Sequence, residues 1–351
     1  MDAAVATTLF EEAQSLRQAG DARALVTGVR ACSLFERVAG RRSFDAVNAR
    51  LLVAGILLDR GAAPKALTEA EVALDALGRT GDVAGNRLRA NALLLIAASN
   101  VALGRYREAI VCATRALKIA RSRLGRTDLV TALNGVGIPY RYLGRHAKAE
   151  KCYREALSLT RDTNSRAALW HNLAGLAHER CRFDEAVACA RRAVRLREKS
   201  RGAVHVATAA DVAELAAVLH ASGNAKEARP LYRRAIRVFE TNLGKDHFEV
   251  GFNLGNLAAL EQQAGRHEEA RRLYARSIRI EERAVGRDHP DVALLLCNLA
   301  KLAQEENRYA EARRLLGRAL PILRKQLGPK HANTVECARS LAGLGATTRR
   351  R

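Results

Sequence analysis

The sequence has 351 residues, and 59 Lys and Arg against 37 Asp and Glu give it a formal net charge of +22. With 48% hydrophobic and 27% charged residues, the composition is that of a folded chain and excludes an intrinsically disordered one. Seven cysteines without a CxxC pair indicate neither a disulfide framework nor a zinc ribbon, and predict a reducing compartment. The length predicts either two domains or an array of repeats.

The basic charge rests on 49 Arg against only 10 Lys, a ratio that a GC-rich genome also produces. An acidic partner is one interpretation of the charge, and genome composition is the other. Residues 1–18 lack the basic and apolar regions of a secretory signal. The longest uncharged stretch, residues 90–104, is too short and too polar to cross a bilayer. We therefore expect a cytoplasmic, soluble protein that does not enter membranes.

An internal repeat dominates the sequence. A small or turn-forming residue recurs between two helical patterns at intervals of 41, 43, 40, 37, 42, 42 and 42 residues. These turn positions are Gly20, Gly61, Gly104, Gly144, Cys181, Gly223, Gly265 and Asn307. Small residues keep step with them, as Ala258, Ala270 and Ser277 do around Gly265. Because two antiparallel helices approach closely only where little side chain separates them, this spacing predicts a stack of helix pairs.

These residues resemble the tetratricopeptide repeat, and segments 256–258, 265–270 and 285–290 resemble its kinesin-light-chain subtype. The resemblance implies an all-α fold, a right-handed tetratricopeptide superhelix (an α-solenoid) of about eight helix pairs with a C-terminal capping helix. We expect a single solenoid over residues 1–346, followed by a basic tail at 347–351. Within it we expect divergent N-terminal units at 1–80, well-formed repeats at 84–327 and the capping helix at 332–344.

Asparagines stand nine residues before three of the turn positions, at Asn172, Asn256 and Asn298, and Asn134 is one residue out of this register. In the resemblance this position faces the concave groove, where a carboxamide can bind the backbone of an extended peptide. The alternative is that the asparagines only cap hydrogen bonds between helices. Further polar side chains are expected on the same inner face: Arg141, His171, His178, His220, Gln262, Lys301 and Gln304.

Arginines form a second candidate surface, eleven residues after five of the turn positions: Arg115, Arg192, Arg234, Arg276 and Arg318. This arginine stripe along the second helices could follow a phosphate backbone, or it could be an ordinary solvated face. Interleaved aromatic residues that would stack on bases are missing. The predicted function is a non-catalytic scaffold or adaptor that binds a protein or peptide partner, expected to be acidic. Nucleic-acid binding and a regulatory subunit of a separate signalling effector are the alternatives.

Signatures of catalysis, cofactors and metals are missing from the sequence. It contains neither a Gly-x-Ser-x-Gly elbow nor a phosphate-binding loop, so we expect no enzyme and no cofactor. Paired carboxylates such as Glu281 and Glu282 are expected at solvated helix positions. Four histidines 42 residues apart are too widely spaced to share a metal and are expected to cap connectors: His205, His247, His289 and His331. The three inner-face histidines have no carboxylate or cysteine at ligand spacing, so no metal site is expected there.

Overall fold

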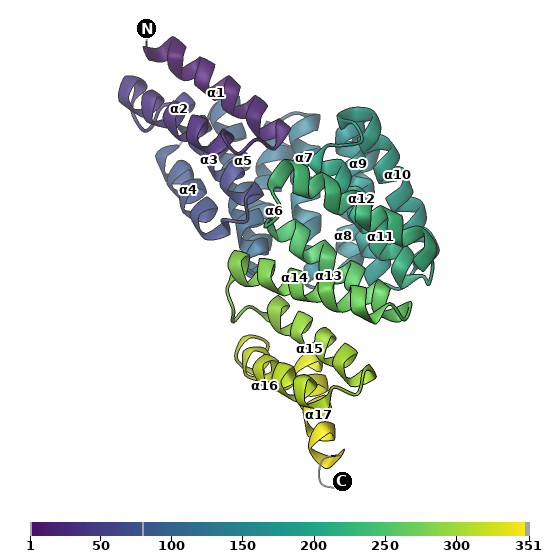
Figure 1. The fold of residues 1–351 in the computed structure, drawn as a ribbon. Helices are drawn as coiled ribbons and strands as arrows, with labels where there is room; N and C mark the ends of the chain where they lie inside the picture. Colours follow the sequence, from purple (N-terminus) through teal and green to yellow (C-terminus); the bar gives the residue numbers. More distant parts are fainter. Residues whose placement is uncertain (1, 79–80, 348–351) are drawn as a thin grey trace. The chain divides into compact units, whose positions relative to one another are not determined.

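The computed structural model describes residues 2–78 and 81–347, and this part of the chain consists of seventeen helices without a strand (Figure 1). In chain order the helices are α1 Asp2–Ala19, α2 Ala24–Ala39, α3 Phe44–Asp59, α4 Ala63–Ala76, α5 Val83–Ala102, α6 Tyr106–Arg123, α7 Arg126–Tyr142, α8 His146–Leu159, α9 Thr163–Glu179, α10 Phe183–Arg201, α11 Val206–Ala221, α12 Ala225–Leu243, α13 Phe248–Gln263, α14 His267–Val285, α15 Pro290–Glu305, α16 Tyr309–Gln326 and α17 Ala332–Thr347. Sixteen of them form eight pairs and α17 follows as the cap, which confirms the predicted all-α fold. Residues 348–351 of the expected basic tail lie outside the described residues.

Each predicted turn position joins the two helices of one pair. All eight residues have a positive φ, including Cys181 at 55° and Asn307 at 60°. At Gly265 the backbone N–H donates to the carbonyl of Gln262 over 2.9 Å, and the next N–H donates to the carbonyl of Glu261 over 2.9 Å. These bonds satisfy carbonyls that the end of α13 leaves free. Glycine recurs at these turns because the left-handed region is open to it without steric cost.

The small residues that flank each turn position are buried where the two helices of a pair touch. Ala258, Ala270 and Ser277 are all 0% exposed. The Ser277 hydroxyl donates to the carbonyl of Gly251 over 2.7 Å, so α14 lies directly against the backbone of α13. The prediction that small residues permit close helix packing is confirmed.

The four connector histidines cap the helices that follow them. In each case the imidazole Nδ1 accepts a hydrogen bond from the backbone N–H two residues later, at distances of 3.0, 3.2, 3.2 and 3.3 Å for His205, His247, His289 and His331. A side-chain acceptor at this position satisfies one of the free N–H groups of a helix start. The expected capping role is therefore confirmed.

The chain divides into two compact units, Met1–Glu214 and Leu215–Arg351, with the boundary inside α11. In the first unit, successive helices pack on one another, and the C-terminal end of α1 also meets the connector before α11. There the Nε2 atom of His205 lies 2.7 Å from the carbonyl oxygen of Gln18.

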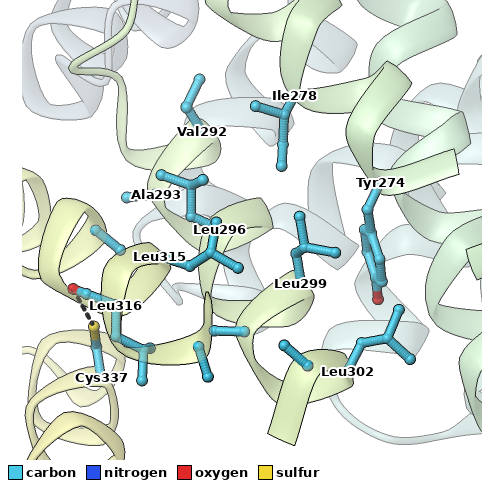
Figure 2. Packing of buried hydrophobic residues seen from close by; sticks show 14 of the residues in the cluster. Tyr274, Ile278, Val292, Ala293, Leu296, Leu299, Leu302, Leu315, Leu316 and Cys337 are labelled. Carbon is cyan, nitrogen blue, oxygen red and sulfur yellow. Dashed lines mark hydrogen bonds between the residues drawn. The ribbon is translucent and has the colours of Figure 1, made fainter. Parts of the chain in front are cut away.

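The second unit has a continuous apolar core, formed by α13 to α17 (Figure 2). Tyr274, Leu296 and Leu302 are at most 2% exposed within it. Helix α17 covers its end, where the Cys337 thiol, 2% exposed, donates to the carbonyl of Leu316 over 3.8 Å. The predicted capping helix is thus present and continues three residues beyond 344. No helix in the described part of the chain is long and apolar enough to cross a membrane.

Candidate functional site

The first helix of each pair carries the predicted groove residues on one face. We define this first-helix face by the positions thirteen, ten, nine, six and three residues before each turn position. On α13 these positions are Phe252, Gly255, Asn256, Ala259 and Gln262. Spacings of three and four residues keep side chains on one side of a helix. All eleven predicted groove residues occupy positions of this face.

Within Leu215–Arg351, α13 and α15 form the walls of a cleft of about 210 Å³, which we call the α13–α15 cleft. It brings Asn256, which is partly buried, together with the exposed Asn298. Nine residues line it: Phe252, Gly255, Asn256, Ala259, Glu281, Asp291, Leu294, Leu295 and Asn298. Polar carboxamides therefore stand beside apolar walls, the usual composition of a binding cleft.

A second cleft of about 160 Å³ adjoins the first, between α15 and the capping helix α17. The two clefts share Leu294 and Asn298. Lys301 and Gln304 line the second cleft only. The structure thus gathers four of the predicted groove residues, Asn256, Asn298, Lys301 and Gln304, along one continuous stretch of the first-helix face.

Other predicted groove residues are engaged by the neighbouring helix pair. At four junctions between successive helix pairs, the residue three before one turn position contacts the residue two before the next. The contacts are Arg17–Asp59 at 2.6 Å, Arg141–Glu179 at 3.0 Å, His220–Gln263 at 3.0 Å and Gln262–Glu305 at 2.9 Å. This polar ladder ties successive pairs together, so Arg141, His220 and Gln262 hold the face in place. Within the described residues, the side chains of Asn256 and Asn298 make no hydrogen bond and are available to a ligand.

In the unit Met1–Glu214 the groove asparagines bind each other. Asn172 Nδ2 donates to Asn134 Oδ1 over 2.7 Å. Asn134, which is one residue out of the asparagine register, therefore still contacts the asparagine of the next helix pair. For this pair the structure shows the hydrogen bond between helices that was the alternative to peptide contact. A variant of Asn172 would therefore also disturb packing.

Two of the three inner-face histidines lie beside carboxylates of α11, the first helix of the next pair, where spacing in the sequence had indicated none. His171 Nδ1 lies 2.9 Å from Asp211 Oδ1, and His178 Nδ1 lies 3.8 Å from Glu214 Oε1. Asp211 is 2% exposed and also accepts from Arg197 Nε over 2.9 Å. Burial acts to lower the pKa of His171, but the contact with Asp211 raises it above 6.5. The described residues contain no group of three or more side chains placed to hold a metal ion.

The expectation that Glu281 is solvated is wrong. Its side chain lies on α14 against α13, the residue is 5% exposed, and it lines the α13–α15 cleft. A Cβ atom at position 251 would lie 2.8 Å from Glu281 Oε1, so Gly251 makes the approach possible. Burial, together with the nearby carboxylates of Asp291 and Glu249, raises the pKa of Glu281 to about 7. Sequence reasoning missed this residue because acidic pairs on amphipathic helices usually face water.

The sequence analysis also did not predict that Phe252 and two asparagines of the first unit line clefts. Phe252 is 57% exposed in the α13–α15 cleft. Asn48 and Asn91 line a cleft of about 330 Å³ in Met1–Glu214. All three stand thirteen residues before a turn position, one helical turn ahead of the asparagine position. Extending the register by four residues would have found them.

The arginine stripe is partly neutralised by the protein itself. Arg276 Nη2 lies 2.6 Å from Glu240 Oε1, and Arg318 forms an ion pair with Glu282. The guanidinium of Arg192 lies 4.6 Å from the centre of the Trp170 ring. Arg115 is exposed, and Arg234 is partly buried. Carboxylates beside the stripe reduce its attraction for a phosphate backbone, which weakens the alternative of nucleic-acid binding.

Comparison with known proteins identifies repeats along most of the chain. The family model described as tetratricopeptide repeat matches residues 88–162, 165–241, 208–280, 250–325 and 291–346. No curated protein matches the sequence.

Solved structures with TM-scores above 0.5 share the fold, and others with lower scores also match the chain. Nearly identical kinesin-light-chain TPR-like repeats from Podosopora anserina are 21% identical, with a TM-score of 0.45 over 57% of this chain and 97% of that one. A Rap protein complexed with competence and sporulation factor is 14% identical, with a TM-score of 0.63 over 99% of this chain and 100% of the other. The third is a signal transduction ATPase with numerous domains and a tetratricopeptide repeat sensor from Pyrococcus horikoshii. It is 11% identical, with a TM-score of 0.62 over 93% of this chain and 50% of that protein.

Proposed function

The chain belongs to the tetratricopeptide repeat family, and from this premise we propose that it is a non-catalytic scaffold or adaptor that holds an extended segment of a partner protein on its first-helix face. Repeats of this family support a protein-interaction scaffold. The observation that carries the finer proposal is the pair of adjoining clefts with the available carboxamides of Asn256 and Asn298.

The chemistry of these clefts suits an extended peptide. A carboxamide offers donors and an acceptor together, so it can bind a peptide backbone whatever side chains the peptide carries. The apolar walls from Leu294 and Leu295 add contact area for alternate side chains. Because the polar ladder already fixes the helix pairs, little conformational entropy is lost on binding. A role as regulatory subunit of a separate signalling effector is compatible with this mode of binding.

We also propose that the protein is cytoplasmic. All seven cysteines are free thiols, and three of them are buried in helix packing. A reducing compartment is where such thiols persist.

Affinity capture from the native cell at physiological salt tests the proposed function. The chain is compared with an Asn256→Ala/Asn298→Ala variant and with an Arg276→Ala/Arg318→Ala variant, which alters the second helices instead. We expect a stoichiometric protein that survives nuclease treatment, is retained by the arginine variant and is lost from the asparagine variant, with helicity unchanged in both. Capture that disappears with nuclease and falls steeply with salt would instead support the arginine stripe.

A further inference from the structure

One oxygen of the Glu281 carboxyl group is buried beside the α13–α15 cleft and has no hydrogen-bond partner in the described part of the chain. Helix α14 approaches α13 closely here, because Ser277 bonds the Gly251 carbonyl and Glu281 follows one helical turn later. Across residues 2–78 and 81–347, Glu281 Oε1 finds no hydrogen-bond donor, although the residue is only 5% exposed. A buried carboxyl oxygen without a donor is destabilising and is uncommon in folded proteins. A ligand that brings a donor would relieve that cost.

The charged groups around Glu281 are of one sign. Glu249 faces it from α13 and Asp291 faces it from the start of α15. The imidazole of His289 lies beside Asp291, with Nδ1 3.4 Å from Asp291 Oδ2. The cleft is therefore a negative site in a chain whose net charge is +22. Such a site attracts a cation and repels an anion.

The size and walls of the cleft indicate a single long side chain. About 210 Å³ is the liquid volume of about seven water molecules at roughly 30 Å³ each, which is too little for a helix. Leu294 and Leu295 offer apolar surface to an aliphatic stem, as the stems of Lys and Arg require. The exposed ring of Phe252 can attract a cation to its face.

We propose that the α13–α15 cleft binds a basic side chain of the partner segment, the ammonium of a lysine or the guanidinium of an arginine, with Glu281 as its anionic partner. The inference rests on the proposed function, because Asn256 and Asn298 would hold the backbone on either side of that residue. It reverses the expectation of an acidic partner at this part of the face.

Binding of the cation is linked to ionisation of Glu281. The basic group pairs with the carboxylate, so the carboxyl proton leaves to solvent as the complex forms. Since the free protein has a Glu281 pKa of about 7, affinity rises as the pH increases through that value. Glu249, Asp291 and His289 stay in place in the variants described below, so a change confined to position 281 isolates its contribution.

Short end-blocked peptide pools that differ at one fixed residue provide the test. The fixed residue is arginine, lysine, citrulline or glutamate, and citrulline has the shape of arginine without its charge. Binding is measured with the full chain, the Glu281→Gln variant and a Glu268→Gln control, which loses an exposed carboxylate from the same helix. We expect the arginine and lysine pools to bind about tenfold more tightly than citrulline, as one charge-assisted hydrogen bond allows. Glu281→Gln should remove the preference and its pH dependence, whereas Glu268→Gln should keep both.

The possible outcomes separate the inference from the proposed function. Equal binding of the arginine and citrulline pools, with loss in Asn256→Ala/Asn298→Ala, overturns the basic-residue inference and leaves the peptide-binding face intact. A preference for arginine that survives Glu281→Gln overturns the role of Glu281. Failure of every pool to bind contradicts both. The comparison of arginine with citrulline needs only the unaltered chain, so it does not depend on how any variant folds.

Discussion

Replacing Glu281 with glutamine should stabilise the protein in a way that depends on pH. The pKa of Glu281 rises from 4.5 to about 7 in the folded chain. The folded state therefore holds this proton more tightly than the unfolded state, and stability is lost as the pH rises from about 4.5 to about 7. At about 1.36 kcal/mol for each pKa unit, the loss amounts to about 3 kcal/mol. A glutamine at position 281 stays neutral, so the variant does not lose this stability as the pH rises.

Urea unfolding of the two proteins at about pH 4 and about pH 8 measures this effect. Hydrogen exchange of α13 to α15 serves as a local probe, because repeat arrays need not unfold as one unit. We expect near-equal stability at the lower pH and an advantage of about 3 kcal/mol for Glu281→Gln at the higher pH. Glu268→Gln, altered at an exposed site of the same helix, should match the unaltered chain at both.

A stability difference that is the same at both pH values would refute this reasoning. It would mean that the Glu281 carboxyl has the same proton affinity in the folded and unfolded chains. Water in the cleft would then solvate the carboxylate, so that neither burial nor the charges of Asp291 and Glu249 would shift its pKa.

Three further predictions concern packing and charge in the helix pairs. Tyr153→Phe should raise the free energy of unfolding by about 1 kcal/mol, because among the described residues the buried Tyr153 hydroxyl has no hydrogen-bond partner. Tyr274→Phe should instead lower it by about 1 kcal/mol, because it removes the 3.1 Å hydrogen bond from the Tyr274 hydroxyl to Gln262. Urea midpoints compare the two, and equal losses would contradict the prediction. Gly137→Ala should lower the stability by about 1–3 kcal/mol, because the added Cβ atom would overlap the Tyr153 ring. An unchanged Tm in thermal unfolding would be inconsistent with that packing. His171→Gln should lower the free energy of unfolding most below pH 6.5 and progressively less at higher pH, because the contact with Asp211 raises the pKa of His171 despite its burial. A loss of stability that does not depend on pH would exclude this ion pair.

The fold was predictable because its determinants are local and repeated. Gly265 stands at a turn because of its left-handed backbone, and Ala258 and Ala270 beside it reveal where two helices touch. Each signal recurs about every 42 residues, so single exceptions such as Cys181 and Asn307 did not obscure the register. The first-helix face followed from the same register, which placed Asn256 and Asn298 in one cleft.

The charges of the site were not predictable in the same way. Whether Glu281 meets water or the α13–α15 cleft depends on how closely α14 approaches Gly251, a contact between helices that periodicity does not report. Arg141 and Gln262 stand at positions of the first-helix face, but their partners Glu179 and Glu305 come from the next pair, which the register does not reveal. The pairing of Asn134 with Asn172 likewise depends on the offset between two helices.

Photo-crosslinking from the first-helix face tests the central claim most directly. A benzophenone amino acid replaces Phe252, which is exposed in the α13–α15 cleft, and a second protein carries it at Arg276 on the arginine stripe. We expect the captured partner to crosslink from position 252 and not from position 276, through a segment that contains a lysine or arginine. Crosslinking from position 276 alone would place the partner on the second helices and contradict the proposed binding face.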